Sequence, residues 1–185
     1  MKLPVFPNCY PFNEMFFDGH LQIGDFAVKT RSWAWKYRGL VLFYTSGRID
    51  HQAIDAYGYE RHPSKHKVII GVANLVEVRP LTNIEARKMV LNFNNWSPQH
   101  LKALLKVSDL PYSQDLEFWS ERIGDFWGER SVLIRPFSIG FFFKNATRLD
   151  RPVPFNWPAG PVRPITIQTA RYPKLHAELL LAHHS

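Results

Sequence analysis

Stretches that favour β-strands stand towards both ends of this chain and enclose a middle of a different kind. Each is rich in β-branched and aromatic residues and is bounded by Gly, Pro or Asn, as strands of globular domains are. They cover residues 38–46, 66–79, 131–135, 138–145 and 163–169. Five or more such strands predict one barrel or curled sheet in a domain of the α+β class.

The middle of the chain carries helical signals. In TNIEARKMVLNF, Thr82 is followed three positions later by Glu85, which is the pattern of a capping box at a helix N-terminus. A second helix is predicted in SPQHLKALLKV, with Ser97 as the N-cap and Pro98 at the first helical position. A length of 185 residues suits one domain. We therefore predict a single domain, residues 1–185, with a helical insertion at about 82–127.

The charge of the chain favours an anionic partner. Lys and Arg number 23 against 16 Asp and Glu, a net charge of +7. Nucleic acid is the commonest partner of this kind for a basic protein. No apolar run is long enough to span a bilayer, and the first residues, MKLPVFPNCYPFNEMFF, lack the pattern of a secretory signal. We expect a cytoplasmic protein with no membrane partner.

The usual catalytic and metal-binding motifs do not occur in the sequence. It has no P-loop, no G-x-G-x-x-G, no H-E-x-x-H and no G-x-S-x-G. The single cysteine, Cys9, excludes an internal disulfide and any zinc site built on paired thiolates, and we interpret it as a part-buried structural thiol. His176, His183 and His184 are interpreted as a solvated tail. No cofactor and no metal site are predicted.

The stretch RSWAWKYRG, residues 31–39, sets flat rings beside cations. If it forms a strand, Arg31, Trp33, Trp35 and Tyr37 share one face, and Lys36 and Arg38 lie on the other. Aromatic rings with basic neighbours are what a protein uses to stack nucleobases and hold phosphates. The same pattern suits the aromatic edge of a core with a solvated back face, so both interpretations stay open.

Residues 28–48 resemble the signature of the ASCH domain, a branch of the PUA-like superfamily that also contains the EVE and YTH modules. Arg31, Ser32 and Trp33 match its R-S-W element, the residues 37–39 its Y-R-G element, and Thr45 and Ser46 its polar strand end. Later pieces follow in the expected order, at 69–82 and at 141–167. The resemblance covers about two thirds of the chain and leaves the helical insertion unmatched.

This resemblance implies a small PUA-like β-barrel of about 5–7 strands with peripheral helices. It also implies a cleft that receives RNA or a single flipped or modified base. Some relatives are hydrolases of acylated pyrimidine nucleosides that use a Lys, a Thr and a Glu, and some are ribonucleases. Here Lys29 stands where the family has Glu or the catalytic Thr, and Phe26 stands where the hydrolases have Lys. The hydrolase pattern is not matched in register, so we do not predict an enzyme.

Three functions remain in competition. The first is a nucleic-acid-binding module, the second a hydrolase or ribonuclease of the same superfamily, and the third a protein-interaction subunit that docks through the insertion, with Trp96, Trp119 and Trp127. Weak catalytic candidates are Lys29, Thr30 and Glu77, with Glu85 nearest to the position of the hydrolase acid. Lys29 is expected either to face solvent or to contact phosphate. Trp157 is expected to be exposed if its Pro-rich segment is a loop, or packed if the segment folds back. The residues predicted to bind nucleic acid are Lys29, Arg31, Ser32, Trp33, Lys36, Arg38, Tyr44, Thr45, Ser46 and Arg48.

Overall fold

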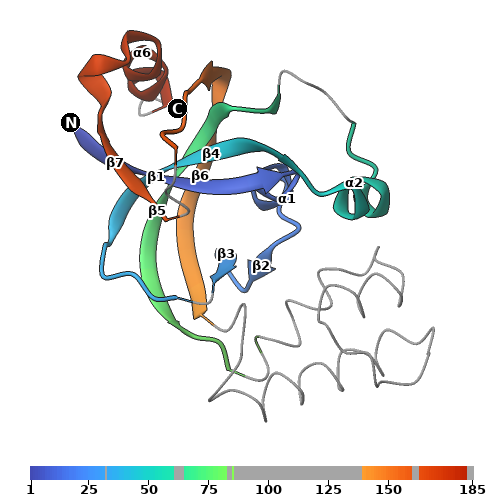
Figure 1. Cartoon of the computed structure of the whole chain (residues 1–185). Coiled ribbons are helices and arrows are strands. Elements are labelled where there is room, and N and C mark those ends of the chain that lie inside the picture. The colour runs from blue at the N-terminus through green and yellow to red at the C-terminus, as the bar shows by residue number, and fades with distance from the viewer. Residues whose placement is uncertain (32, 61–64, 83–84, 86–138, 160–162, 183–185) are drawn as a thin grey trace.

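The computed structural model of the chain is a single curled sheet with short helices around it (Figure 1). It describes residues 1–31, 33–60, 65–82, 85, 139–159 and 163–182. The strands are β1 (Lys2–Tyr10), β2 (Gln22–Ile23), β3 (Phe26–Arg31), β4 (Gly39–Ile49), β5 (Val68–Pro80), β6 (Ile139–Pro154) and β7 (Ile165–Gln168). The helices are α1 (Phe12–Phe17), α2 (His51–Tyr57) and α6 (Pro173–Ala182), and a short 3-10 helix, Thr169–Arg171, joins β7 to α6.

The sheet is mixed, and its seven described strands lie in the order β2-β3-β6-β5-β4-β1-β7. Strand β1 runs parallel to β4, and every other neighbouring pair is antiparallel. This arrangement confirms the α+β class. In the described part of the chain the edge strands β2 and β7 are not hydrogen-bonded to each other, so the sheet is open and the expected closure of a barrel is not seen.

Most of the strand predictions agree with the structure. Strands β4, β5 and β7 lie at the predicted places, and β6 begins at the predicted place but runs nine residues further than expected, to Pro154 rather than 145. The capping box is formed, because the Thr82 backbone N–H donates to the Glu85 carboxylate (2.9 Å) and the Glu85 N–H donates to the Thr82 hydroxyl (3.3 Å). The predicted strand at 131–135 and the remainder of the helical insertion lie outside the described residues.

Strand β1 lies inside the sheet, between β4 and the edge strand β7, which the sequence did not indicate. Its sequence, KLPVFPNCY, contains Pro4 and Pro7, and proline inside a run argues against a central strand because it donates no ladder hydrogen bond. The pairing with β7 covers only residues 2–5, so Pro7 lies beyond it. The carbonyl of Pro7 instead accepts a hydrogen bond from the Arg31 side chain (3.2 Å).

Strand β6 bends where Asn145 interrupts the regular ladder. Val72 pairs with Thr147 and Asn74 pairs with Lys144, so two residues of β6 lie opposite one residue of β5. Asn145 has φ of 52°, a left-handed conformation that Asn tolerates better than most residues. The bulge bends this long strand, which helps the sheet to curl around its own core.

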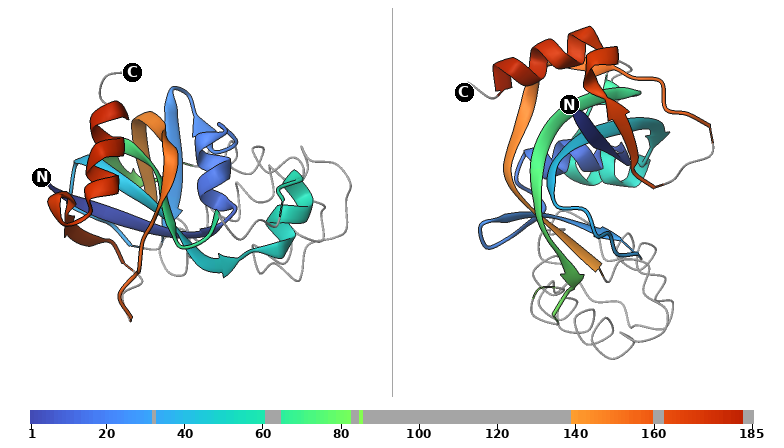
Figure 2. Two further views of the ribbon diagram at one scale, coloured as in Figure 1. Left: turned by 90° about the horizontal axis from the view of Figure 1, so that it is seen from above. Right: turned by 90° about the vertical axis from the view of Figure 1, so that its left-hand side faces the viewer.

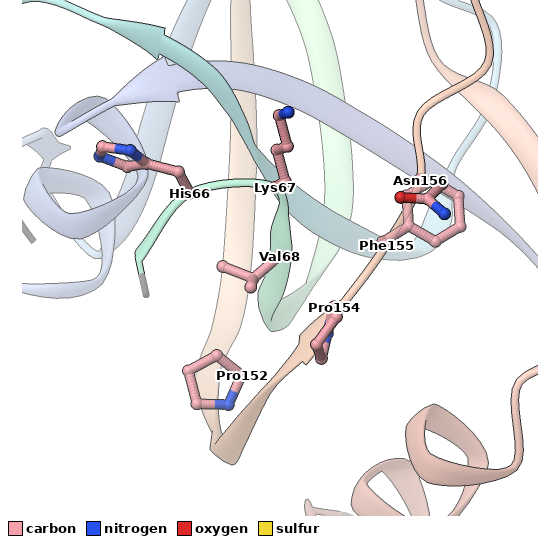
Figure 3. A pocket seen from close by; sticks show the side chains of 7 residues that line it. All are labelled: His66, Lys67, Val68, Pro152, Pro154, Phe155 and Asn156. Atoms are coloured by element: carbon pink, nitrogen blue, oxygen red, sulfur yellow. The ribbon is translucent and has the colours of Figure 1, made fainter. Parts of the chain in front are cut away.

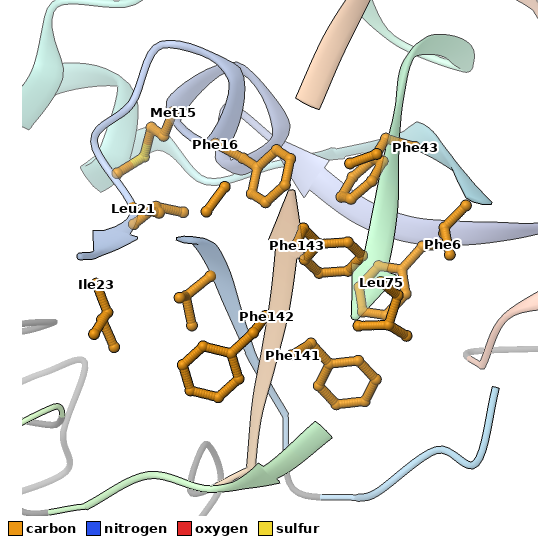
Figure 4. Close-up of a cluster of buried hydrophobic side chains, with 14 of the residues drawn as sticks. Phe6, Met15, Phe16, Leu21, Ile23, Phe43, Leu75, Phe141, Phe142 and Phe143 are labelled. Atoms are coloured by element: carbon orange, nitrogen blue, oxygen red, sulfur yellow. The ribbon is translucent and has the colours of Figure 1, made fainter. Parts of the chain in front are cut away.

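Two hydrophobic clusters fill the fold. The first is rich in phenylalanine and is drawn in Figure 4, and a series of ring contacts joins Phe6, Phe16, Phe43, Phe141 and Phe143. The second gathers residues of β1, β4, β5 and β6 with Leu175 and Leu179 of α6. Helix α6 packs against β6, and Figure 2 shows it far from α2. Fully burying one such side chain contributes about 1.5–3 kcal/mol, so these clusters are the main source of stability.

Helix α1 is held against β6 by ionic contacts. The Arg148 guanidinium donates to the Glu14 carboxylate, to the Glu14 carbonyl (3.2 Å) and to Asp18 (2.6 Å). Tyr59 donates to the other oxygen of Asp18 (2.7 Å). A six-residue helix is not stable alone, and these bonds fix its position over the first cluster. None of the described helices is long and apolar enough to cross a membrane.

Candidate nucleic-acid interface

Residues 33–38, between β3 and β4, form a connection without strand structure, although the pattern of faces was considered for a strand. Strand β3 ends at Arg31 and β4 begins at Gly39, and Ser32 lies outside the described residues. The predicted alternation of faces is nevertheless present. Trp33, Trp35 and Tyr37 are half-buried against the first cluster, while Lys36 and Arg38 are exposed. We refer to residues 33–38 as the aromatic segment.

Local contacts hold the aromatic segment in one conformation. The rings of Trp35 and Tyr37 stack at 5.0 Å with an interplanar angle of 29°, and the Tyr37 hydroxyl donates to the carbonyl of Leu40 (2.9 Å). The Arg38 guanidinium donates to the carbonyls of Trp35 (2.9 Å) and Tyr37 (2.7 Å). Arg38 therefore has a structural role in the turn, beside any role in binding. Gly39, with φ of 117°, makes the entry into β4 in a conformation that few other residues adopt.

Trp33 lies where three distant parts of the chain meet. Its ring is 6.2 Å from the ring of Phe6 on β1 and 5.2 Å from the ring of Phe141 on β6. The guanidinium of Arg163, just before β7, lies over it at 5.7 Å from the ring centroid. Because Val5 pairs with Ile165, the start of β7 reaches the part of β1 that carries Phe6.

Arg163 is the functional candidate that the sequence reasoning missed. Its sequence context, PVRP, has no distinguishing signal, and it is 130 positions from Trp33. Only the pairing of β1 with β7 places it beside the aromatic segment. Arg163 could have been identified from the sequence only if β1 had been predicted as a strand that pairs with β7.

Lys29 is buried, which contradicts the first of the two expectations for it, that it faces solvent. Only 2% of its surface is exposed, and its ammonium donates to the carbonyl of Phe12 and lies 5.1 Å from the centroid of the Phe16 ring. Burial, and then the positive charge of Arg31, hold the pKa of Lys29 well below its usual value. Contact of this ammonium with a phosphate requires the surrounding residues to open.

Arg31, also on β3, reaches towards β1, to which β3 is not paired in the sheet. Its guanidinium donates to the carbonyls of Thr30 (2.7 Å) and Pro7 (3.2 Å) and lies 4.6 Å from the centroid of the Phe6 ring. Burial lowers the pKa of Arg31 to about 10, so the side chain remains charged at neutral pH. Lys29 and Arg31 thus link β3 to the β1–α1 region by side-chain bonds, in a place where the sheet has no ladder.

Two of the residues predicted on β4, Tyr44 and Thr45, are used inside the fold. Thr45 is fully buried and accepts from the Asn13 amide (3.1 Å), and Tyr44 is stacked against Trp157 at 5.0 Å and 15°. Trp157 is therefore packed, which decides between the two expectations for it. Ser46 is half-buried and Arg48 is exposed. The predicted set is thus divided between the two ends of β4.

The weak catalytic candidates are not brought together. Lys29 pairs with Phe141, whereas Glu77 pairs with Phe142, the next residue of β6. Paired residues project from the same face and successive residues from opposite faces, so Lys29 and Glu77 point to opposite sides of the sheet. Thr30 shares a face with Glu77, but β6 lies between their strands, a separation of about 10 Å.

The two carboxylates near the end of β5 are already paired with one cation. Arg79 binds Glu85 through two bonds of 2.6 Å and contacts Glu77 at 3.1 Å. The hydrogen bonds from Arg79 are the main cause that lowers the pKa of Glu85 to about 2. A carboxylate held this firmly in its ionised form is a poor general acid, and this arrangement does not favour the hydrolase alternative.

An open pocket of ≈ 480 Å³ lies at the other end of these two strands, between the start of β5 and the end of β6 (Figure 3). Pro152, Pro154 and Phe155 supply apolar walls, and Lys67 and Asn156 supply polar groups. In Figure 3 the Lys67 side chain points away from the prolines. The polar groups do not converge on one point, so the pocket lacks the features of a specific site.

Cys9 is part-buried, as predicted, and burial is the main cause that raises the pKa of its thiol. A thiol with a raised pKa is a weak nucleophile at neutral pH. Within the described ranges, no group of three or more His, Cys, Asp or Glu side chains is placed to hold a metal ion.

Comparisons with known proteins give similarities in structure only. No protein-family model matches the sequence, and no curated protein matches it. The structure is similar to that of ASCH from Zymomonas mobilis, with a TM-score of 0.49, 11% identity and coverage of 96% of this chain and 92% of that chain. It is also similar to a mutant of ZmASCH from the same organism, with a TM-score of 0.46, 12% identity and coverage of 96% and 98%. Both of these neighbours are ASCH structures.

Proposed function

We propose that this protein is a nucleic-acid-binding module of the ASCH and PUA-like kind, which binds RNA or a flipped or modified base in the cytoplasm. One observation carries the proposal. In the aromatic segment, half-buried indole rings lie among cations, with Arg163 over Trp33 and with Lys36 and Arg38 exposed. Rings of this kind stack bases of any sequence, and neighbouring cations attract phosphates.

The position of the rings supports a role beyond packing. Trp33 and Trp35 contact the core through Phe6, yet neither is among the fully buried residues. The contact with the core fixes each ring, so little conformational entropy is lost when a base stacks on the remaining surface. The net charge of +7 adds long-range attraction to any nucleic acid.

Binding to labelled oligonucleotides tests the proposal. Fluorescence anisotropy is measured with single-stranded RNA, single-stranded DNA and duplex at two salt concentrations. We expect affinity whose logarithm falls linearly with the logarithm of salt concentration, because bound phosphates release counterions. Trp33→Leu should weaken binding by about 1–3 kcal/mol.

The matched control is Trp157→Leu. Trp157 is also half-buried, but it stacks on Tyr44 in the second cluster. This variant should bind as the wild type does, and circular dichroism should show both variants folded. Absence of binding to every oligonucleotide, or affinity independent of salt, would exclude the proposed function.

A further inference from the structure

The contact between Arg163 and Trp33 differs from the other arginine contacts near the aromatic segment. Arg38 is held by carbonyl groups of the segment, and Arg31 is held by carbonyls of β3 and β1. Arg163 is exposed, and in the described part of the chain no carboxylate pairs with it. Its guanidinium lies over the face of the Trp33 ring, 5.7 Å from the ring centroid.

An exposed cation over a ring is easily displaced. Such a contact is worth roughly a two- to five-fold factor in an equilibrium constant, whereas stacking of a base on an aromatic ring is worth roughly a five- to 150-fold factor. A base therefore competes successfully for this face. An arginine that leaves the ring near a nucleotide also gains charge-assisted hydrogen bonds to phosphate.

The distance between the Arg163 guanidinium and the Trp33 ring decides whether a base can enter between them or has to displace the arginine. A base between two stacked planes needs two stacking spacings of about 3.4 Å, or about 7 Å in all. The guanidinium lies 5.7 Å from the centroid of the Trp33 ring, which is too close for a base to enter while Arg163 stays in place. Arg163 must move outward or leave the face.

We propose that the face of Trp33 now covered by Arg163 is the binding site of one unpaired nucleobase. When the base binds, Arg163 gives up its contact with the ring and binds a phosphate of the same strand. The ligand class is single-stranded nucleic acid, because a paired base inside a duplex has both faces covered by its neighbours. This inference rests on the proposed function and deepens it.

The test compares Arg163→Ala with Arg171→Ala. Arg171 is also exposed, but it follows β7 at the end that pairs with Lys2, away from the Phe6 side. The probe is a labelled single-stranded 12-mer of uridylate, measured by anisotropy at four salt concentrations. Arg163→Ala should bind more weakly and reduce the slope of log affinity against log salt by about 0.7, the value for one phosphate on a single strand. Arg163→Lys should keep the wild-type slope, and Arg171→Ala should leave affinity and slope unchanged.

A second probe separates the base from the phosphate. In a 12-mer that lacks all its bases, Trp33→Leu should have no effect, while Arg163→Ala should still reduce the slope. If Trp33→Leu weakens the binding of both probes equally, Trp33 does not bind a base. An unchanged slope in Arg163→Ala, or equal affinity for duplex and single strand, would overturn the exchange even if the wild type binds. Failure of the wild type to bind any oligonucleotide instead removes the proposed function itself.

Discussion

The two halves of β4 carry similar residues and have different uses. Before its first residue, Gly39, the aromatic segment presents half-buried rings and exposed cations. From the middle of the strand onward the side chains are covered, since Tyr44 is buried under Trp157 and Thr45 is bonded to Asn13. Tyr44 lies about 17 Å along the strand from Gly39 and packs in the second cluster, whereas the aromatic segment packs against the first, so the two regions do not form one binding surface. The comparison teaches that coverage by other elements, rather than residue type, decides which groups are available to a ligand.

The largest expected effect is on stability at the covered end. Tyr44→Ala removes a ring that is 3% exposed and packs against Phe155 and Trp157, so we expect a loss of about 3–5 kcal/mol in the free energy of unfolding. Urea denaturation measures this loss. Trp35→Ala, at the open end, should cost clearly less because its ring is half-buried. Equal losses would break the comparison.

A smaller effect is expected for the buried hydroxyl of the same end. Thr45→Val removes the acceptor of the Asn13 amide, whose oxygen also has no hydrogen-bond partner among the described residues. We expect a loss of about 1–3 kcal/mol, because a buried amide is left unsatisfied. Ser46→Ala, one position further, should change the free energy of unfolding by less than about 0.5 kcal/mol. Thermal melts of both variants provide the measurement.

The burial of Lys29, which links β3 to α1, should make the stability of the protein depend on pH. The pKa of Lys29 is lowered in the folded protein, so between that pKa and its usual value of 10.5 the unfolded chain binds more protons. Stability must then rise with pH, by at most about 1.4 kcal/mol per pH unit for one group.

Lys29→Met should remove this rise. The comparison with wild type is made by urea denaturation between pH 7 and 10.5, the usual pKa of a lysine. In the upper part of this range the raised pKa values of Cys9 and of Tyr10 act in the opposite direction in both proteins. The groups around the ammonium are Arg31, Cys9 and Glu14. Parallel pH profiles of wild type and variant would show that the ammonium titrates as it does in the unfolded chain.

The smallest expected effect is that of removing one exposed positive charge on nucleic-acid binding. Lys36 is exposed on the aromatic segment, and Arg48 is exposed at the other end of β4. Lys36→Ala should weaken binding to single-stranded RNA a few-fold and reduce the salt slope by about 0.7. Arg48→Ala, with the same loss of charge, should leave the slope unchanged. A larger effect of Arg48→Ala would move the interface to the far end of β4.

The sequence by itself determined the class of the fold and much of its strand content. The β-branched and aromatic runs that became β4, β5 and β7 were readable because strand propensity and turn residues are local properties. The capping box of Thr82 and Glu85 was readable for the same reason. The alternation of half-buried rings and exposed cations in residues 33–38 was also visible, although the chain there is not a strand.

Only the tertiary structure decided which of these groups reach a ligand. Strand β1 was hidden by its two prolines, and its pairing with β4 and β7 places Phe6 under Trp33 and brings Arg163 to the same ring. The curl of the sheet buries Lys29, a residue that the sequence allowed to face solvent. Burial and long-range proximity depend on contacts between residues far apart in the chain, and no local pattern of residues encodes them.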